Sequence, residues 1–166
     1  HQWASFKCLQ PMYNLVKRQA EVEILPLAAS ENLAVIPYSP LGGGLLSGKY
    51  GVDKTPDSGR LTENKMYQTR YGDAIHYQAA SQLTAFAQKH GWHPATVAIA
   101  WVESHPAVTA PIIGARNIEQ LEPALQAADF EMTPELRAEI SAFTTEPAPA
   151  TDRIEEKTVK SMWGPR

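Results

Sequence analysis

Three short apolar segments that alternate with helical patterns constrain the fold of this chain more than any other feature. Residues 5–10, 34–38 and 109–113 are short, apolar and bounded by turn residues, which predicts strands. Short strands that alternate with helices are typical of parallel β/α units, so the sequence predicts an α/β fold. Apolar spacing and helix start signals predict helices over residues 21–32, 74–90, 95–104, 117–127 and 134–143.

Composition and charge exclude several classes of protein. The chain has 166 residues, of which 43% are hydrophobic and 20% charged, as expected for about one globular domain. Its net charge of −3 and pI of about 6.0 argue against a nucleic-acid surface. No segment approaches the ~18 consecutive apolar residues of a membrane helix. The single cysteine, Cys8, cannot form an internal disulfide, which favours a cytoplasmic location.

The stretch VIPYSPLGGGLLSGKYG at residues 35–51 raises the question of a phosphate-binding loop. It contains G-x-x-x-x-G-K, but Tyr50 stands where a Walker A loop needs a serine or threonine hydroxyl for Mg²⁺. The next residues, 51–73, are rich in glycine, proline and charge, so we expect a long polar loop without an apolar-faced helix. The dinucleotide fingerprint also fails, because Ser47 replaces its third glycine. A plain glycine-rich turn after a buried strand remains an open alternative.

Four segments stand in a recognisable order along the chain. They are QPMYNLVKR at 10–18, VIPYSPLGGGLLSGKY at 35–50, TVAIAWVESHP at 96–106 and PIIGARNIEQL at 111–121. In this order and spacing they resemble the C-terminal half of an aldo-keto reductase. The resemblance implies that residues 1–166 form a partial (β/α)8 TIM barrel, with strands six to eight and their helices. Three such strands are too few to close an eight-stranded barrel alone.

The resemblance also implies the cofactor-binding half of an NADPH-dependent oxidoreductase that reduces aldehydes or ketones to alcohols. An N-terminal half-barrel or another chain is then needed to complete the fold, and homo-oligomerisation stays open. His1 stands in place of an initiator methionine, so we expect the chain to begin partway through a longer protein. Residues 145–166 begin with a proline- and alanine-rich run and are expected to form an extended tail.

Two residues at strand ends are implied to hold the nicotinamide. By resemblance, Gln10 hydrogen-bonds the carboxamide, and Tyr38 lays its ring on the nicotinamide. An amide group fixes the rotation of a ligand ring, and an aromatic face supports it. From the residues alone, Gln10 could merely end a strand and Tyr38 could fill the core, so both interpretations stay open here.

The turn after Tyr38 is implied to contact the pyrophosphate through backbone N–H groups and a serine hydroxyl. Glycine lets the backbone approach anionic oxygens closely and adopt positive φ. The loop at 51–73 is long enough to fold over a cofactor, and Lys49 could equally be a solvated surface charge. The candidate residues of this turn are Ser39, Pro40, Leu41, Gly43, Gly44 and Lys49.

A second anchor is implied at Gly114, Ala115, Arg116 and Gln120. Asn117 is expected to cap the following helix, whose free N–H groups then point toward whatever lies beside Arg116. A guanidinium next to a helix N-terminus suits a 2′-phosphate, which favours NADP(H) over NAD(H). By resemblance, Gln120 reaches the adenosine end. The chain has Pro123 and Ala124 where the family often has an acidic residue and asparagine, so the adenine contacts are expected to differ.

The resemblance assigns no catalytic residue to this chain. The family's catalytic tyrosine, lysine, aspartate and histidine lie in the N-terminal half, and no tyrosine here has a matching context. His90 and His93 have no cysteine or carboxylate to complete a ligand set, so no metal site is expected. Trp101 and Phe143 are expected in the core, and Trp163 either edges a substrate pocket or belongs to a disordered tail.

Three functional hypotheses stay open. The chain is a portion of an NADPH-dependent carbonyl reductase, a nucleotide-binding regulatory protein similar to the potassium-channel β subunits, or an inactive truncated fragment. An Asp/Tyr/Lys/His set in the missing half would favour the first hypothesis. The carbonyl substrate is not identified, because the loops that select it are expected outside these residues.

The first prediction concerns turnover by the chain alone. Because the general acid and its partners are expected elsewhere, purified residues 1–166 should show weak or no oxidation of NADPH with a simple aldehyde, followed by absorbance at ~340 nm. Turnover at an ordinary enzyme rate, about 1 per second or more, would contradict this expectation.

Overall fold

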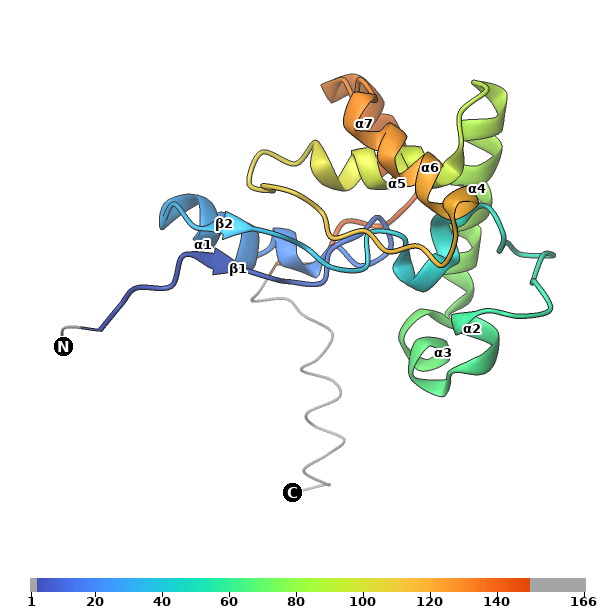
Figure 1. The fold of residues 1–166 in the computed structure, drawn as a ribbon, viewed down its shortest axis with the longest axis horizontal. Helices are drawn as coiled ribbons and strands as arrows, with labels where there is room; N and C mark the ends of the chain where they lie inside the picture. The colour runs from blue at the N-terminus through green and yellow to red at the C-terminus, as the bar shows by residue number, and fades with distance from the viewer. Residues whose placement is uncertain (1–2, 150–166) are drawn as a thin grey trace.

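A small parallel sheet and several short helices make up this α/β structure. The computed structural model describes residues 3–149 (Figure 1). Strand β1 (Cys8–Leu9) pairs in parallel with strand β2 (Ala34–Val35). The α-helices are α1 (Ile24–Ser30), α2 (Arg60–Glu63), α3 (Lys65–Tyr71), α4 (Ala74–Lys89), α5 (Pro94–Glu103), α6 (Ile118–Leu125) and α7 (Pro134–Ser141). The 3-10 segments are η1 (Gln19–Glu21), η2 (Gly42–Ser47) and η3 (Gln126–Asp129).

The third predicted strand is present as a parallel segment beside β2. Tyr38 forms parallel bridges with Met12 on one side and with Ile112 on the other. The Ile112 N–H donates to the Pro37 carbonyl at 2.8 Å. The three predicted strand segments therefore lie side by side in parallel, as the β/α pattern indicates.

Regular strand pairing is shorter than the sequence predicts. Only two residues in each of the first two predicted strands are paired, as β1 and β2. Residues 109–113 contribute a single bridge. Pro11, Pro37 and Pro111 explain much of this difference, because proline has no N–H to donate to a sheet ladder.

Helix α5 is the centre of the hydrophobic core. All of its residues from Pro94 to Val102 are buried, so the helix is enclosed by other parts of the chain on every side. Trp101 is fully buried, lies 5.3 Å from the Tyr13 ring and donates from Nε1 to the Ser141 hydroxyl at 2.9 Å. Phe143 is partly buried and packs against the same core. The prediction that Trp101 and Phe143 are core residues is confirmed.

The prediction that residues 51–73 form a helix-free polar loop is wrong for its second half. Residues 60–71 contain α2 and α3, and they bury Leu61 and Tyr71 against the main core. Asn64 begins α3 by accepting the Met66 N–H at 2.9 Å. These two short helices owe their stability to tertiary contacts, which composition does not reveal.

The end of the chain is described only in part. Residues 145–149 form no helix or strand. Residues 150–166, including Trp163, lie outside the described residues. In residues 3–149, no helix is long and apolar enough to cross a membrane.

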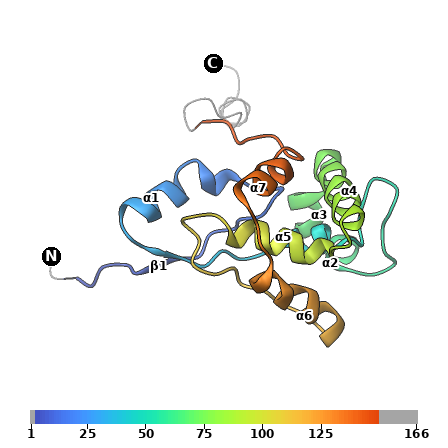
Figure 2. The same ribbon diagram turned by 90° about the horizontal axis from the view of Figure 1, so that it is seen from above.

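Two helices expose apolar side chains. Helix α6 exposes Ile118, Leu121 and Leu125, which are spaced to share one helix face. Helix α1, which contacts β2, exposes Ile24 and Leu27. Helices α1 and α6 lie well apart on the molecule in Figure 2. Exposed apolar side chains on one helix face favour association with other polypeptides.

The second prediction concerns the exposed face of α6. The purified chain should self-associate as its concentration rises, measured as mass by light scattering after size exclusion, and Leu125→Lys should reduce that association. Val52→Lys is the matched control, since Val52 is 61% and Leu125 55% exposed but Val52 lies in a loop outside this face. A monomer at every concentration, or equal effects of both substitutions, would contradict the prediction.

Candidate functional site

The carboxyl ends of three parallel segments meet at one edge of the sheet. This follows because parallel strands run in the same direction. The bridges place Tyr38 level with Met12 and with Ile112. Gln10 precedes Met12 by two residues, and side chains two apart in a strand share a face. Gln10 and Tyr38 therefore lie on the same face, with Gln10 nearer the amino ends of the strands.

The face that carries Gln10 and Tyr38 is open, whereas the opposite face is packed. Val35 is fully buried on the packed face and shares the core with Leu25 of α1. In contrast, Gln10 is exposed and Tyr38 is half-buried. The two candidate nicotinamide residues thus lie on the one sheet face that remains available to a ligand.

The turn after Tyr38 has an unusual backbone. Ser39 has a φ of 61°, in the left-handed region that residues with a side chain seldom adopt. Its carbonyl accepts the Gly42 N–H at 2.9 Å, which closes a turn over the buried Pro40 and the half-buried Leu41. Gly43 and Gly44 then have φ values of 70° and 104°, so these two positions require glycine.

This turn is not a Walker A loop. No helix begins within residues 50–59, directly after Lys49, whereas a Walker A loop opens straight into a helix. The sequence led to the same conclusion, because Tyr50 stands where a Walker A loop has a serine or threonine after the lysine. The stretch is a glycine turn at the end of a parallel segment.

Helix α3 covers the glycine turn with the Tyr67 ring. A Cβ added at Gly43 would lie 2.6 Å from Tyr67 Cδ1, so the ring rests directly on the backbone. The guanidinium carbons of Arg60 and Arg70 lie 5.7 and 5.8 Å from the centre of that ring. Two cations therefore gather beside the turn, which is favourable for an anionic ligand.

Sequence reasoning missed Arg60, Tyr67 and Arg70 because it treated their segment as a loop. One signal was present in the sequence. Asn64 is a good cap residue, and Tyr67 and Tyr71 follow it at a spacing that places two rings on one helix face. The structure bears this out, since these two rings are stacked with their centres 6.4 Å apart.

The second candidate anchor lies at the start of α6. Asn117 caps the helix by accepting the Gln120 N–H at 3.0 Å, as predicted. The Gln120 Oε1 accepts the Arg116 N–H at 3.2 Å, so Gln120 holds the backbone of the anchor itself. Gly114, Ala115 and Arg116 are exposed, and a Cβ at Gly114 would meet nothing within 4 Å. The surface beside Gly114 is therefore unobstructed in the described part of the chain.

Two exposed cations act on titratable groups near the candidate site. Burial raises the pKa of the Tyr50 phenol, and the charge of Arg116 makes a small opposing contribution. Burial lowers the pKa of His93 at the start of α5, and the charge of Lys49 lowers it further.

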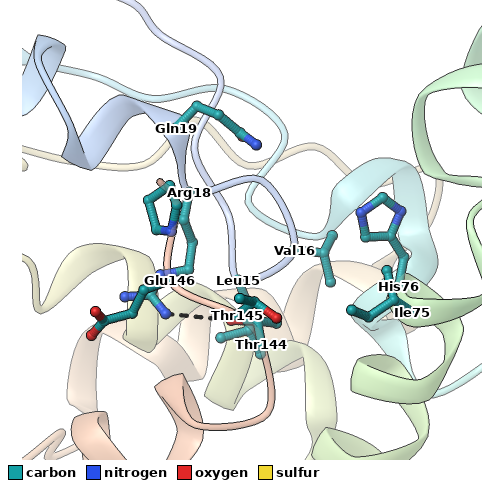
Figure 3. A pocket seen from close by; sticks show the side chains of 10 residues that line it. Leu15, Val16, Arg18, Gln19, Ile75, His76, Thr144, Thr145 and Glu146 are labelled. Carbon is teal, nitrogen blue, oxygen red and sulfur yellow. Dashed lines mark hydrogen bonds between the residues drawn. The ribbon is translucent and has the colours of Figure 1, made fainter. Parts of the chain in front are cut away.

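A separate cavity is lined by residues of the 15–19 segment, the start of α4 and the 144–147 segment (Figure 3). It has a volume of about 220 Å³, and none of the predicted cofactor residues lines it. The Arg18 guanidinium at its wall is already paired with Glu21 at 2.9 Å and donates to Thr144 Oγ1 at 3.4 Å. His76 also lines it, and the buried Nδ1 of His76 has no hydrogen-bond partner among residues 3–149. Burial, followed by the charge of Lys17, lowers the pKa of His76.

Possible metal ligands and the buried Tyr13 complete the survey of titratable groups in the described residues. Across residues 3–149, no three His, Cys, Asp or Glu side chains group to hold a metal ion. The hydroxyl of Tyr13 donates to Glu21 and accepts from Arg137 inside the core, and burial raises its pKa. Tyr13 is therefore a packing residue.

Fold and site together define a class of protein. The chain is a parallel β/α protein whose open face, glycine turn and capped helix gather at the carboxyl ends of its strands. In parallel β/α proteins this is the edge at which ligands bind.

The chain belongs to the Aldo/keto reductase family, whose sequence profile matches residues 1–144. It is 36% identical over 130 residues to YrpG, an uncharacterized oxidoreductase of Bacillus subtilis, covering 76% of this chain and 37% of that protein. It is 32% identical over 144 residues to protein tas of Escherichia coli, covering 85% and 41%. A putative aryl-alcohol dehydrogenase of Saccharomyces cerevisiae is 30% identical over 139 residues, covering 81% and 36%. The chain thus spans well under half the length of these relatives.

The third prediction isolates the contact between Tyr67 and the glycine turn. Gly43→Ala should destabilise the chain by at least about 1 kcal/mol more than Gly91→Ala, because only the first new methyl group meets a ring. The two positions are matched in backbone strain, with φ values of 70° and 72°, and Gly91 has nothing within 4 Å of the added Cβ. Urea unfolding measures the difference. Equal destabilisation would show that Tyr67 does not rest on the turn.

Proposed function

We propose that this chain is the NADP(H)-binding portion of an aldo-keto reductase that reduces aldehydes or ketones to alcohols. The observation that carries the proposal is the meeting of Tyr38, the glycine turn and the Arg116 anchor at the carboxyl edge of three parallel segments. The family assignment supports the same chemistry. The bound cofactor supplies a hydride to the carbonyl carbon, and the chain's residues bind and orient it.

Gln10 and Tyr38 are proposed to hold the nicotinamide. Both occupy the open face of the sheet, and the Tyr38 backbone is bridged on both sides, which makes its ring a firm support. A nicotinamide that lies flat on an aromatic ring presents only its other face to a substrate. The Gln10 amide has both a donor and an acceptor, as the carboxamide requires.

The glycine turn is proposed to bind the pyrophosphate. Positive φ at Gly43 and Gly44, with no Cβ, gives anionic oxygens close access to the backbone. The Ser39 hydroxyl is proposed as a further donor, beside Pro40 and Leu41. The nearby cations Arg60 and Arg70 support this role, and Lys49, an exposed cation soon after the turn, is proposed as a further phosphate neighbour.

Gly114, Ala115 and Arg116 are proposed to bind the adenosine 2′-phosphate end of the cofactor. Arg116 is exposed, stands just before the capped N-terminus of α6 and has unobstructed surface beside it at Gly114. A guanidinium beside helix N–H groups favours a phosphate over a hydroxyl. Gln120 holds the Arg116 backbone, because its Oε1 accepts the Arg116 N–H. Its amide nitrogen is proposed to contact the adenosine.

The chain is proposed to act as part of a complete (β/α)8 barrel. Among residues 3–149 the sheet consists of three parallel segments, and α1 and α6 expose apolar side chains. The relatives YrpG and protein tas are each more than twice as long as the region that matches this chain, as a complete barrel requires. We propose that an amino-terminal half-barrel covers these faces and carries the general acid and its partners, in a cytoplasmic protein.

The fourth prediction tests the 2′-phosphate role of Arg116. Arg116→Ala should weaken NADPH binding about tenfold or more, because it removes a charge-assisted hydrogen bond, and should change NADH binding less than about twofold. Quenching of tryptophan fluorescence during titration of the 166-residue chain measures both affinities.

Lys89→Ala is the control for net charge, since Lys89 is an exposed cation at the C-terminal end of α4 and is not among the proposed cofactor residues. It should leave both affinities within about twofold of the native values. Equal losses for NADPH and NADH in Arg116→Ala would remove the 2′-phosphate role. No binding of NADPH by the chain at millimolar concentration would contradict the proposed cofactor site.

A further inference from the structure

Asn14 is a fully buried polar side chain with every polar atom paired. Its Oδ1 accepts the Val16 N–H at 3.1 Å, and its Nδ2 donates to the Ser39 carbonyl at 3.0 Å and to the Tyr71 hydroxyl at 3.2 Å. An N–H faces Oδ1 and a carbonyl faces Nδ2, so the partners themselves determine which way the amide points. Such complete pairing holds a buried amide in one orientation.

The carbonyl that Asn14 holds belongs to the residue with the least favourable backbone of the site. Ser39 has a φ of 61°, and its carbonyl also accepts the Gly42 N–H at 2.9 Å. A left-handed serine persists only where its surroundings hold it. The Tyr38 backbone is tied into the sheet on one side of Ser39, and the Asn14 amide ties the carbonyl on the other.

We infer that Asn14 is a positioning residue for cofactor binding, which keeps Ser39 left-handed so that the Tyr38 ring and the glycine turn face one ligand. The inference rests on the proposed NADP(H) site. With Ser39 in the ordinary right-handed or extended region, the chain leaves Tyr38 in another direction and the glycine turn moves away from the strand end. Asn14 itself contacts no cofactor atom in this account, because it is buried beneath the turn.

Tyr71 connects this contact to helix α3. The buried Tyr71 hydroxyl accepts from Asn14, and its ring stacks with Tyr67, which covers Gly43. A Cβ at Gly42 would lie 3.5 Å from the Tyr71 ring, so the same tyrosine also packs beneath the turn. Asn14 thus joins the strand end, the turn and the helix that covers the turn.

The fifth prediction is that glycine at position 39 relieves the need for Asn14. Asn14→Ala should weaken NADPH binding about tenfold, since the left-handed conformation loses its support. The double variant Asn14→Ala/Ser39→Gly should recover affinity to within about twofold of Ser39→Gly alone, because glycine adopts positive φ without strain. A purely structural role for Asn14 would lower stability without this recovery of affinity.

Urea unfolding tests the contact independently of any cofactor. Ser39→Gly should raise the folding equilibrium constant about fivefold more in the Asn14→Ala background than in the native one. Asn32→Gly is the matched control, because Asn32 also has positive φ, at 50°, but has no contact with Asn14 in the described hydrogen bonds. Its effect should be the same in both backgrounds.

Asn14→Asp is the second variant, in case Asn14→Ala does not fold. It keeps the shape of the side chain and the Val16 contact but places an oxygen against the Ser39 carbonyl. Its NADPH affinity should recover toward the native value at low pH, where the protonated carboxyl again donates a hydrogen.

The outcomes separate the two proposals. If the native chain binds NADPH but Asn14→Ala binds equally well, or Ser39→Gly shows no coupling to Asn14 in unfolding, the positioning role is overturned and the cofactor site stands. If the native chain binds no NADPH while the unfolding coupling is found, the cofactor site is overturned, and Asn14 is shown to hold Ser39 without a positioning role for this ligand.

Discussion

The backbone pairing of Tyr38 is the constraint on which the candidate site depends. Tyr38 is bridged to Met12 on one side and to Ile112 on the other, so three segments far apart in sequence are held parallel at one level. Parallel pairing brings all three carboxyl ends to the same edge, and the turns that leave them inherit this position. The aromatic ring, the glycine turn and the Arg116 anchor are therefore neighbours because of backbone hydrogen bonds, before any side chain contributes.

Side chains then stabilise a turn that its own backbone disfavours. Ser39 is left-handed, and the buried Asn14 amide holds its carbonyl. Tyr67 covers Gly43, where only a glycine leaves room for the ring. The turn is thus supported from below by a buried amide and covered from above by an aromatic ring. Such support is what keeps a binding site in one geometry before a ligand arrives.

Much of this arrangement could be predicted from the sequence, and the failures have physical causes. The parallel segment at residues 34–38, the cap at Asn117 and the burial of Trp101 follow local patterns that the structure repeats. Helices α2 and α3 were missed because helices of four and seven residues depend on tertiary contacts more than on propensity. The use of the Gln120 Oε1 to hold Arg116 was missed because it depends on local cap geometry.

The sequence by itself determined the family, the alternation of strands and helices, and the glycine-rich turn at residues 42–44, where positive φ occurs. These depend on local pattern and on which residues tolerate a given backbone conformation. Only the tertiary structure decided that Asn14 reaches across 25 residues to Ser39 and 57 residues to Tyr71, and that Arg60 and Arg70 lie beside the turn. Partners so distant along the chain are chosen by how the packed elements meet, because burial requires each polar group to find whichever partner the fold brings to it.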